Sequence, residues 1–309
     1  MLNYIGKRML IGIFSLFVLV TAAFFLVRQM PGSPFQTGNV SEQIQQQIEK
    51  EYGLDKPPVQ QYKTYLSNLL RGDFGVSYKK QGVTVAQIIG RAAPITFSVG
   101  GLAVLAALAG GTLLGIWQAV TKRNYIKNGI LFGTMLGSGI PNFVIALLLA
   151  LLFGVKWKLL PIAGLTGWKS YILPVVSLAV YPMSVVTRIM QNTFSAEMCQ
   201  NYVLLARTKH LSMRKIYFRH ILPNAWIPVL NYAGPASAFL LTGSFVVESI
   251  FTIPGLGREF VNSIANRDYT LILGLTVFMG VVVIGINLLV DILCVWLDPR
   301  ITYENSSRI

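Results

Sequence analysis

Six long stretches without a charged residue dominate this sequence and limit what it can fold into. Each is close to the roughly 20 apolar residues that a helix needs to cross the hydrocarbon core of a bilayer. Hydrophobic residues make up 53% of the chain and charged residues 12%, with a mean hydropathy of +0.58, which excludes a soluble domain. The sequence therefore predicts an all-α membrane protein with six transmembrane helices. The stretches are Met9–Val27, Ile95–Val120, Gly129–Val155, Tyr171–Thr187, Trp226–Val247 and Leu271–Val290.

Two of these stretches have features of their own. The fourth, Tyr171–Thr187, is the shortest and carries Pro174 and Pro182. Proline bends a spanning helix and is tolerated where neighbouring helices surround it, so we expect a bent helix buried among neighbours. The first stretch runs into Arg28 and Pro31 without a small-residue cleavage site. It is predicted to be a retained helix, not a signal peptide.

Basic residues predict the orientation of the helices, because lysine and arginine accumulate in cytoplasmic loops. Both termini are predicted to be cytoplasmic, although Lys156, Lys158 and Lys169 fall on the outer side and count against a clean rule. The net charge of +14 then reflects the cytoplasmic face and anionic lipid, since no nucleic-acid-binding motif occurs. The basic residues on the predicted cytoplasmic side are Lys7, Arg8, Lys122, Arg123, Lys127, Arg207, Lys209, Arg214, Lys215 and Arg219.

The basic segment, residues 193–225 between the fourth and fifth stretches, is also amphipathic. A turn is expected at His210-Leu211, after which Ser212 can cap a second helix that stops before Pro223. Charge alone, with Glu197 as the one acid, fits an ordinary cytoplasmic loop equally well. In the first helix, four side chains lie close to one face at helical spacing: Phe194, Met198, Tyr202 and Leu205.

Residues 31–93, between the first two stretches, are long enough to fold outside the membrane. One helix is predicted from Ser41 to Gly53 and a second from Pro57 to Gly72. The segment is either a cap over the spanning helices or a docking surface for an extracellular donor protein. The sequence favours neither.

The sequence argues against catalysis by this chain. It has no G-x-x-x-x-G-K-[ST] loop to cradle phosphates, so it is not expected to hydrolyse ATP. Ser138 lies in the third stretch, but His210 and His220 lie in the basic segment, out of reach for a Ser–His pair. Gly137 and Gly139 are better explained by close helix packing.

Few other groups suggest a site. Glu248 lies near the outer end of the fifth stretch and Asp291 near the inner end of the sixth. Near an interface a neighbouring arginine or water suffices for an acid, so a structural role is favoured for both. A proton-coupled carrier would need more central ionisable groups. Cys199 and Cys294 imply neither a disulfide nor a metal site, and no cofactor is expected.

Several motifs are more specific than composition. Ala206–Ser212 reads A-R-x-K-x-L-S and Arg219–Pro228 reads R-H-x-x-x-N-A-x-x-P, which resembles the coupling loop of ATP-binding-cassette importer permeases. The whole set is similar to the B-type permease of the peptide/nickel branch, and most similar to the oligopeptide permease because of Met30–Phe35 and Leu241–Glu248. Other motifs of this resemblance are Tyr52–Pro57, Leu69–Gly75, Leu159–Pro161, Ile172–Pro174, Val247–Gly257, Arg267–Tyr269 and Leu297–Arg300.

The resemblance implies a type I importer permease fold with six transmembrane helices and a small extracytoplasmic helical segment after the first. The expected units are an N-terminal transmembrane helix (1–30), the extracytoplasmic helical segment (31–93), a five-helix permease core (94–297) that includes the basic segment, and a cytoplasmic tail (298–309).

The resemblance also implies partners. The chain would pair with a homologous second permease, sit on two ATPase subunits that bind ATP and Mg, and receive oligopeptides from an extracellular substrate-binding protein. A dipeptide or nickel/metallophore permease of the same family remains an alternative, as does a stand-alone channel or carrier. No substrate-pathway residue is predicted. The implied ATPase contacts are Ala206, Arg207, Lys209, His210, Leu211, Ser212, Arg214 and Lys215.

Two positions depart from the family's pattern. Its coupling loop reads Glu-Tyr-Val and Lys-Gly-Leu-Ser, where this chain has Asn201 before Tyr-Val and His210 in place of the glycine. Glycine at such a turn permits a positive φ, which histidine adopts only at some cost. We therefore expect the substitutions to affect two features: the turn geometry at His210 and the partner contacts near Asn201.

Overall fold

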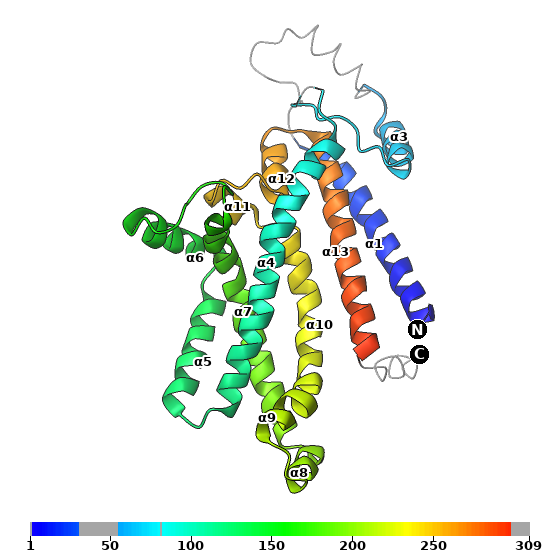
Figure 1. The fold of residues 1–309 in the computed structure, drawn as a ribbon. Coiled ribbons are helices and arrows are strands. Elements are labelled where there is room, and N and C mark those ends of the chain that lie inside the picture. The colour runs from blue at the N-terminus through cyan, green and yellow to red at the C-terminus, as the bar shows by residue number, and fades with distance from the viewer. Residues whose placement is uncertain (1, 31–54, 81, 298–309) are drawn as a thin grey trace.

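The computed structural model describes residues 2–30, 55–80 and 82–297 (Figure 1). Among these residues the chain is helical, with one isolated β-bridge between Val76 and Thr84. The helices, with π-helical segments written η, are α1 (Leu2–Arg28), α3 (Pro58–Leu70), α4 (Val85–Val120), α5 (Asn124–Gly139), α6 (Asn142–Leu149), η1 (Ala150–Lys156), α7 (Trp168–Met198), α8 (Asn201–Thr208), α9 (Met213–Ile216), η2 (Tyr217–Ile221), α10 (Leu222–Leu241), α11 (Phe245–Ile250), α12 (Leu256–Ala265) and α13 (Tyr269–Leu297).

Five helices of the described chain are long and apolar enough to cross a membrane: most of α1, α4, α7, the run Met213–Ile250, and most of α13. The pair formed by α5 and α6–η1 makes a sixth candidate if it counts as one span, but it is bent by 105°. The third predicted stretch is therefore not one straight helix. The bend falls at Ile140-Pro141, because proline lacks an N–H and holds the preceding residue in an extended conformation.

The central helix is α7, which contacts α4, α5, α6 and α10 (Figure 1). Half of its apolar window is buried, the largest share among the candidate spans. The expected burial of this stretch among neighbours is confirmed. Pro174 and Pro182 both lie inside α7, and the helix continues through them.

Small residues let α4 approach α7 closely. A Cβ on Gly111 would lie 2.8 Å from the carbonyl oxygen of Met183 and 2.7 Å from the side chain of Val186. A Cβ on Gly115 would lie 2.7 Å from the carbonyl oxygen of Thr187. Lipid is as apolar as leucine, so helices in a membrane associate through close packing of this kind.

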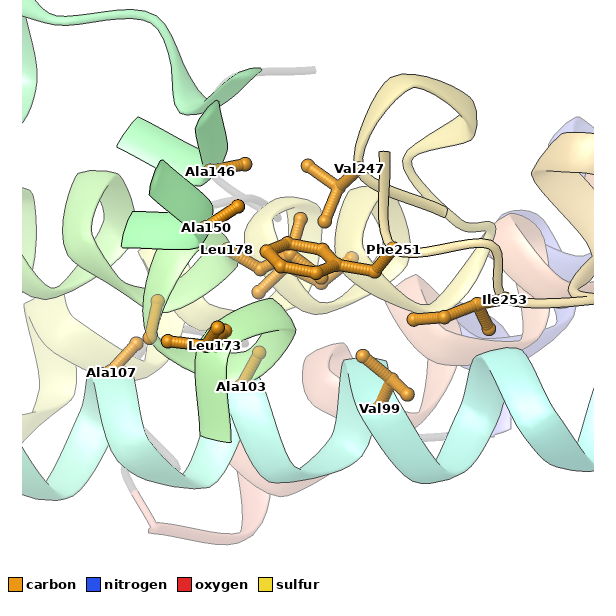
Figure 2. Close-up of a cluster of buried hydrophobic side chains, with 12 residues drawn as sticks. Val99, Ala103, Ala107, Ala146, Ala150, Leu173, Leu178, Val247, Phe251 and Ile253 are labelled. Atoms are coloured by element: carbon orange, nitrogen blue, oxygen red, sulfur yellow. The ribbon is translucent and has the colours of Figure 1, made fainter. Parts of the chain in front are cut away.

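A cluster of buried apolar side chains joins α4, α6, α7 and α11 (Figure 2). In this view Phe251, which follows α11, lies among side chains of the other helices. Ala146 and Ala150 are to its upper left. The cluster therefore packs α6 and α11 against the central helices. Its members are Val99, Ala103, Ala107, Ala146, Ala150, Leu173, Leu178, Ala179, Leu240, Val247, Phe251 and Ile253.

Helix α4 begins well before the predicted apolar stretch. Thr84 is its N-cap: the Thr84 hydroxyl accepts a hydrogen bond from the backbone N–H of Gln87, and the Gln87 side chain accepts one from the N–H of Thr84. Pro94 lies inside this helix, so the expected unit boundary between 93 and 94 falls within α4. The capping box, not hydropathy, decides where α4 starts.

The helix predicted from Pro57 to Gly72 is confirmed as α3. It packs against the end of α1, where the Tyr62 and Thr21 hydroxyls are 2.6 Å apart and the Tyr62 and Phe24 ring centroids are 5.1 Å apart. The helix predicted from Ser41 to Gly53 lies outside the described residues.

Glu248 is buried where α11 and α12 meet α4, with 4% of its surface exposed. Its carboxylate accepts a hydrogen bond from the Thr96 hydroxyl at 2.9 Å and one from the backbone N–H of Arg258 at 2.9 Å. The Thr96 hydroxyl in turn accepts the backbone N–H of Leu256 at 2.8 Å. These bonds tie the start of α12 to α4, which supports the structural role favoured for Glu248.

Two further acids also have structural partners. Asp268 is 1% exposed and accepts hydrogen bonds from the backbone N–H groups of Tyr78 at 3.1 Å and Leu271 at 3.2 Å. It thereby joins the segment before α4 to the start of α13. Asp291 lies 3.2 Å from the guanidinium of Arg8, the kind of neighbour expected for an acid near an interface.

Removing the Thr96 hydroxyl should destabilise the fold. In Thr96→Val the Leu256 N–H and one Glu248 oxygen lose their partner while the side-chain shape is kept, so we expect a loss of about 1–3 kcal/mol in unfolding free energy. Thr276→Val is the matched control, because the Thr276 hydroxyl bonds only the Ile272 carbonyl of its own helix. Thermal unfolding in detergent would compare the two. Equal unfolding midpoints would contradict this role for Thr96.

Candidate functional site

The basic segment lies at one end of the bundle, which we call the α8 end; α3 and α12 lie at the other, the α12 end (Figure 1). Helix α7 stops at Met198, and the chain breaks at Cys199-Gln200 before α8. After a turn, α9, η2 and α10 follow one another without a gap. The segment is thus a short helical hairpin between two long helices.

The prediction that the second helix stops before Pro223 is wrong. Pro223 lies in the first turn of α10, where a missing N–H costs little, and the π-helical η2 precedes it. Ser212 is at the N-cap position of α9, but its side chain makes no capping hydrogen bond.

The predicted apolar face is also wrong at Leu205, whose side chain is 58% exposed. Phe194 is fully buried, but on α8 the buried residues are Val203 and Ala206. The break at Cys199-Gln200 interrupts the helical period, so a face counted from Phe194 does not continue into α8.

The turn after α8 has the geometry in which glycine is preferred. The N–H of His210 donates to the carbonyl of Arg207 at 2.9 Å, and the N–H of Leu211 donates to that of Ala206 at 3.3 Å. This is a Schellman motif, and His210 has a φ of 53° at its left-handed position. Histidine in place of glycine therefore keeps the turn, at a cost of roughly 1 kcal/mol.

Tyr202 ties α8 to the two long helices. Its hydroxyl donates a hydrogen bond to the carboxylate of Glu197 in α7 at 2.5 Å. The same hydroxyl accepts one from the side-chain amide of Asn224 in α10 at 3.3 Å. Partial burial, and then the bond to Glu197, raise the pKa of the Tyr202 phenol. This link could not be predicted from the sequence, because nothing in the residue spacing indicates that the start of α10 lies beside α8.

Most of the predicted contact residues are exposed and face solvent around this hairpin. Ala206 is the exception, buried among apolar residues, and Leu211 is partly buried. Apolar side chains of the hairpin are also exposed: Leu205, as described above, and Leu204 and Met213, which no sequence pattern indicated. The surface thus combines exposed apolar groups with a basic rim. The exposed predicted residues are Arg207, Lys209, His210, Ser212, Arg214 and Lys215.

Within the described residues the other candidate chemistry does not come together. No group of three or more His, Cys, Asp or Glu could hold a metal ion, and Cys199 and Cys294 are both free. A Cβ on Gly137 would collide with Ser184, so its predicted role in close packing is confirmed. A Cβ on Gly139 would meet no atom within 4 Å, so close packing does not explain that glycine.

The fold defines a multi-pass membrane protein. The fold matches a chain from a structure titled "Inward facing conformations of the MetNI methionine ABC transporter", with a TM-score of 0.51 over 69% of this chain and 95% of that chain, at 16% identity. At that identity the match concerns the fold alone.

The sequence comparisons identify the family. Residues 111–303 match the family described as "Binding-protein-dependent transport system inner membrane component", and residues 1–100 match its N-terminal family. The chain is 38% identical to the dipeptide transport system permease protein DppB of Bacillus subtilis, over 97% of this chain and 98% of the relative. It is also 38% identical to the oligopeptide transport system permease protein OppB of Haemophilus influenzae, over 98% and 100%. The chain belongs to the binding-protein-dependent transport system inner membrane components.

Tyr202→Phe should loosen α8 while leaving the bundle intact. The hydroxyl shared by Glu197 and Asn224 is lost, so we expect the protection of α8 amides in hydrogen exchange to fall by about 1 kcal/mol. Tyr125→Phe is the control, because the Tyr125 hydroxyl accepts only an exposed bond from Arg123. Unchanged protection of α8 in Tyr202→Phe would contradict the link.

Proposed function

We propose that this chain is the permease subunit of an ATP-driven importer that moves oligopeptides into the cytoplasm by alternating access. The observation that carries the proposal is the exposed hairpin at the α8 end, in which apolar side chains are surrounded by basic ones. Helices dock in grooves through such apolar anchors, and a basic rim pairs with acids around the groove. Family membership and the names of the full-length relatives support the substrate class.

The geometry suggests how force would pass from an ATPase into the membrane. A push on α8 would reach α7 and α10 together, because Tyr202 bonds to Glu197 and Asn224 on those helices. Helix α7 contacts α4, α5 and α6, so its movement would rearrange the bundle. In this proposal two ATPase subunits bind ATP and Mg, a homologous second permease forms the other half, and an extracellular substrate-binding protein delivers the peptide.

Dipeptide import is the second candidate function. The observation that favours it is the 38% identity to a dipeptide permease, equal to that of an oligopeptide permease. A nickel or metallophore permease of the same family would share this fold. No observation favours that alternative, because the described residues contain no group of three or more His, Cys, Asp or Glu that could hold a metal ion. A stand-alone channel or carrier would need no partner at the α8 end, so it would not explain why Leu204, Leu205 and Met213 are exposed there.

Arg214→Glu should disrupt coupling without disturbing membrane insertion. Arg214 is exposed on the hairpin, and its reversal puts a like charge opposite the acids of an ATPase groove. We expect ATPase co-purification and peptide uptake to fall together by roughly tenfold or more, since such repulsion costs several kcal/mol. Peptide binding to the donor protein should stay unchanged, and the chain alone should hydrolyse no ATP.

Lys122→Glu is the matched control for this experiment, because Lys122 lies between α4 and α5, outside the basic segment. It should retain uptake. If Arg214→Glu and Leu211→Asp both kept full uptake and ATPase recovery, the basic segment would serve topology only, and the proposed docking role would be wrong.

The proposed orientation is tested by cysteine labelling in a Cys199→Ser, Cys294→Ser background. Both positions are exposed on the protein surface, so a cysteine at either can react. Gln60→Cys on α3 should react with an impermeant reagent added outside, and His210→Cys should react only after the membrane is opened. The positive-inside bias is the physical reason for this expectation. The reverse pattern at either position would overturn the orientation.

A further inference from the structure

The run formed by α6 and η1 leaves the direction of the bundle. It is bent by 105° from α5 and extends sideways near α11 in Figure 1. Helix α5 has 16 residues, about 24 Å at 1.5 Å per residue, which is shorter than the roughly 30 Å hydrocarbon thickness, and its first turn carries Lys127. Because of the 105° bend, α6–η1 runs across the direction of α5 and does not continue it along the bundle.

Most large side chains of this run lie on the outside, while Leu149 and Phe153 are partly buried against the protein. Ala146 and Ala150 face the protein and pack in the cluster with Phe251 (Figure 2). The opposite face repeats at helical spacing and is 36–55% exposed. One face packed against protein and a continuous, exposed apolar face opposite it are typical of a helix that faces lipid. The outward residues are Phe143, Leu147, Leu148, Leu151, Leu152 and Val155.

Basic and aromatic residues follow at the end of the run. Segment η1 ends at Lys156 and is followed by Trp157 and Lys158, and α7 begins with Trp168 and Lys169. All five side chains are exposed. The ammonium of Lys169 lies 5.9 Å from the centre of the Trp168 ring. Tryptophan and lysine are the residues that occupy the headgroup level of a bilayer.

The charges around these lysines indicate what they bind. No Asp or Glu occurs in the sequence between Asp73 and Glu197. Lys156, Lys158 and Lys169 make no ion pair within the part of the chain that the structure describes. In the proposed orientation they also lie on the side of the membrane where the positive-inside rule predicts few basic residues. An anionic group outside the protein would explain all three.

A lipid surface fits better than a protein partner. The cores of protein interfaces are depleted in lysine, whereas lysine beside tryptophan is common where a helix meets headgroups. Each lysine near an anionic membrane surface also gains binding energy from it. We propose that α6–η1 lies in the membrane interface at the α12 end, with its outward face in the acyl chains, and that Lys156, Lys158 and Lys169 bind the phosphates of anionic phospholipids.

Native mass spectrometry of the purified chain with phosphatidylglycerol tests the headgroup contact. Changing the three lysines to glutamine should weaken phosphatidylglycerol binding roughly tenfold or more, and changing them to arginine should restore it. The matched control removes three basic charges from or beside α3: Lys56→Gln, Lys63→Gln and Arg71→Gln, all exposed. It should change binding less than twofold. Equal weakening in the control, or none in the glutamine triple, would overturn the proposal.

A spin label at Leu151→Cys, without the two native cysteines, tests the outward face with all lysines in place. In the assembled transporter in bilayers, the label should be readily relaxed by oxygen, which concentrates among acyl chains, and poorly by a water-soluble nickel chelate. A label shielded from both reagents would show that another protein chain covers this face. That result would overturn the lipid assignment. It would not bear on the proposed peptide import, which is tested separately by uptake.

Discussion

The close contact between α4 and α7 is the interaction on which the rest of the structure depends. Apolar side chains gain little from associating in lipid, so the bundle needs places where backbones approach each other. Gly111 and Gly115 provide them, because any side chain there would collide with Met183, Val186 or Thr187. With α7 fixed against α4, its other sides are free to carry α5, α6 and α10, and its last turn leads directly into the α8 hairpin.

At the α12 end, buried carboxylates hold the connecting segments together, beside glycines such as Gly255 that also leave no room for a side chain. Glu248 and Asp268 lie in the segments that connect long helices, and each accepts hydrogen bonds from backbone N–H groups of a helix start. A buried charge is costly unless it is paired in this way, so each acid requires its connecting segment to hold one conformation. The two ends of the molecule thus differ: buried carboxylates fix the connecting segments at the α12 end, while most charged residues of the α8 hairpin are exposed to solvent.

Hydropathy predicted the long helices well, because membrane insertion depends on composition over about 20 residues. It could not predict their ends, which depend on single residues such as the Thr84 cap and Pro141. In the basic segment the turn at His210 was predictable from local chemistry, since one position needs a positive φ. The exposure of Leu205 and the link from Tyr202 to Asn224 were not, because they depend on how α8 is placed against α7 and α10.

Two surfaces of this chain combine exposed leucines with lysine or arginine, and composition alone does not separate them. On α8 the apolar residues Leu204 and Leu205 are a short interruption among polar neighbours, on a helix of eight residues that lies beyond the end of α7. On α6–η1 the apolar face continues for the whole run, and the basic residues come only at its end. A short apolar patch within a charged rim matches a groove on a protein. A continuous apolar face with charges at one end matches the boundary between acyl chains and headgroups. The same residue types therefore point to a protein partner at one end of the bundle and to lipid near the other.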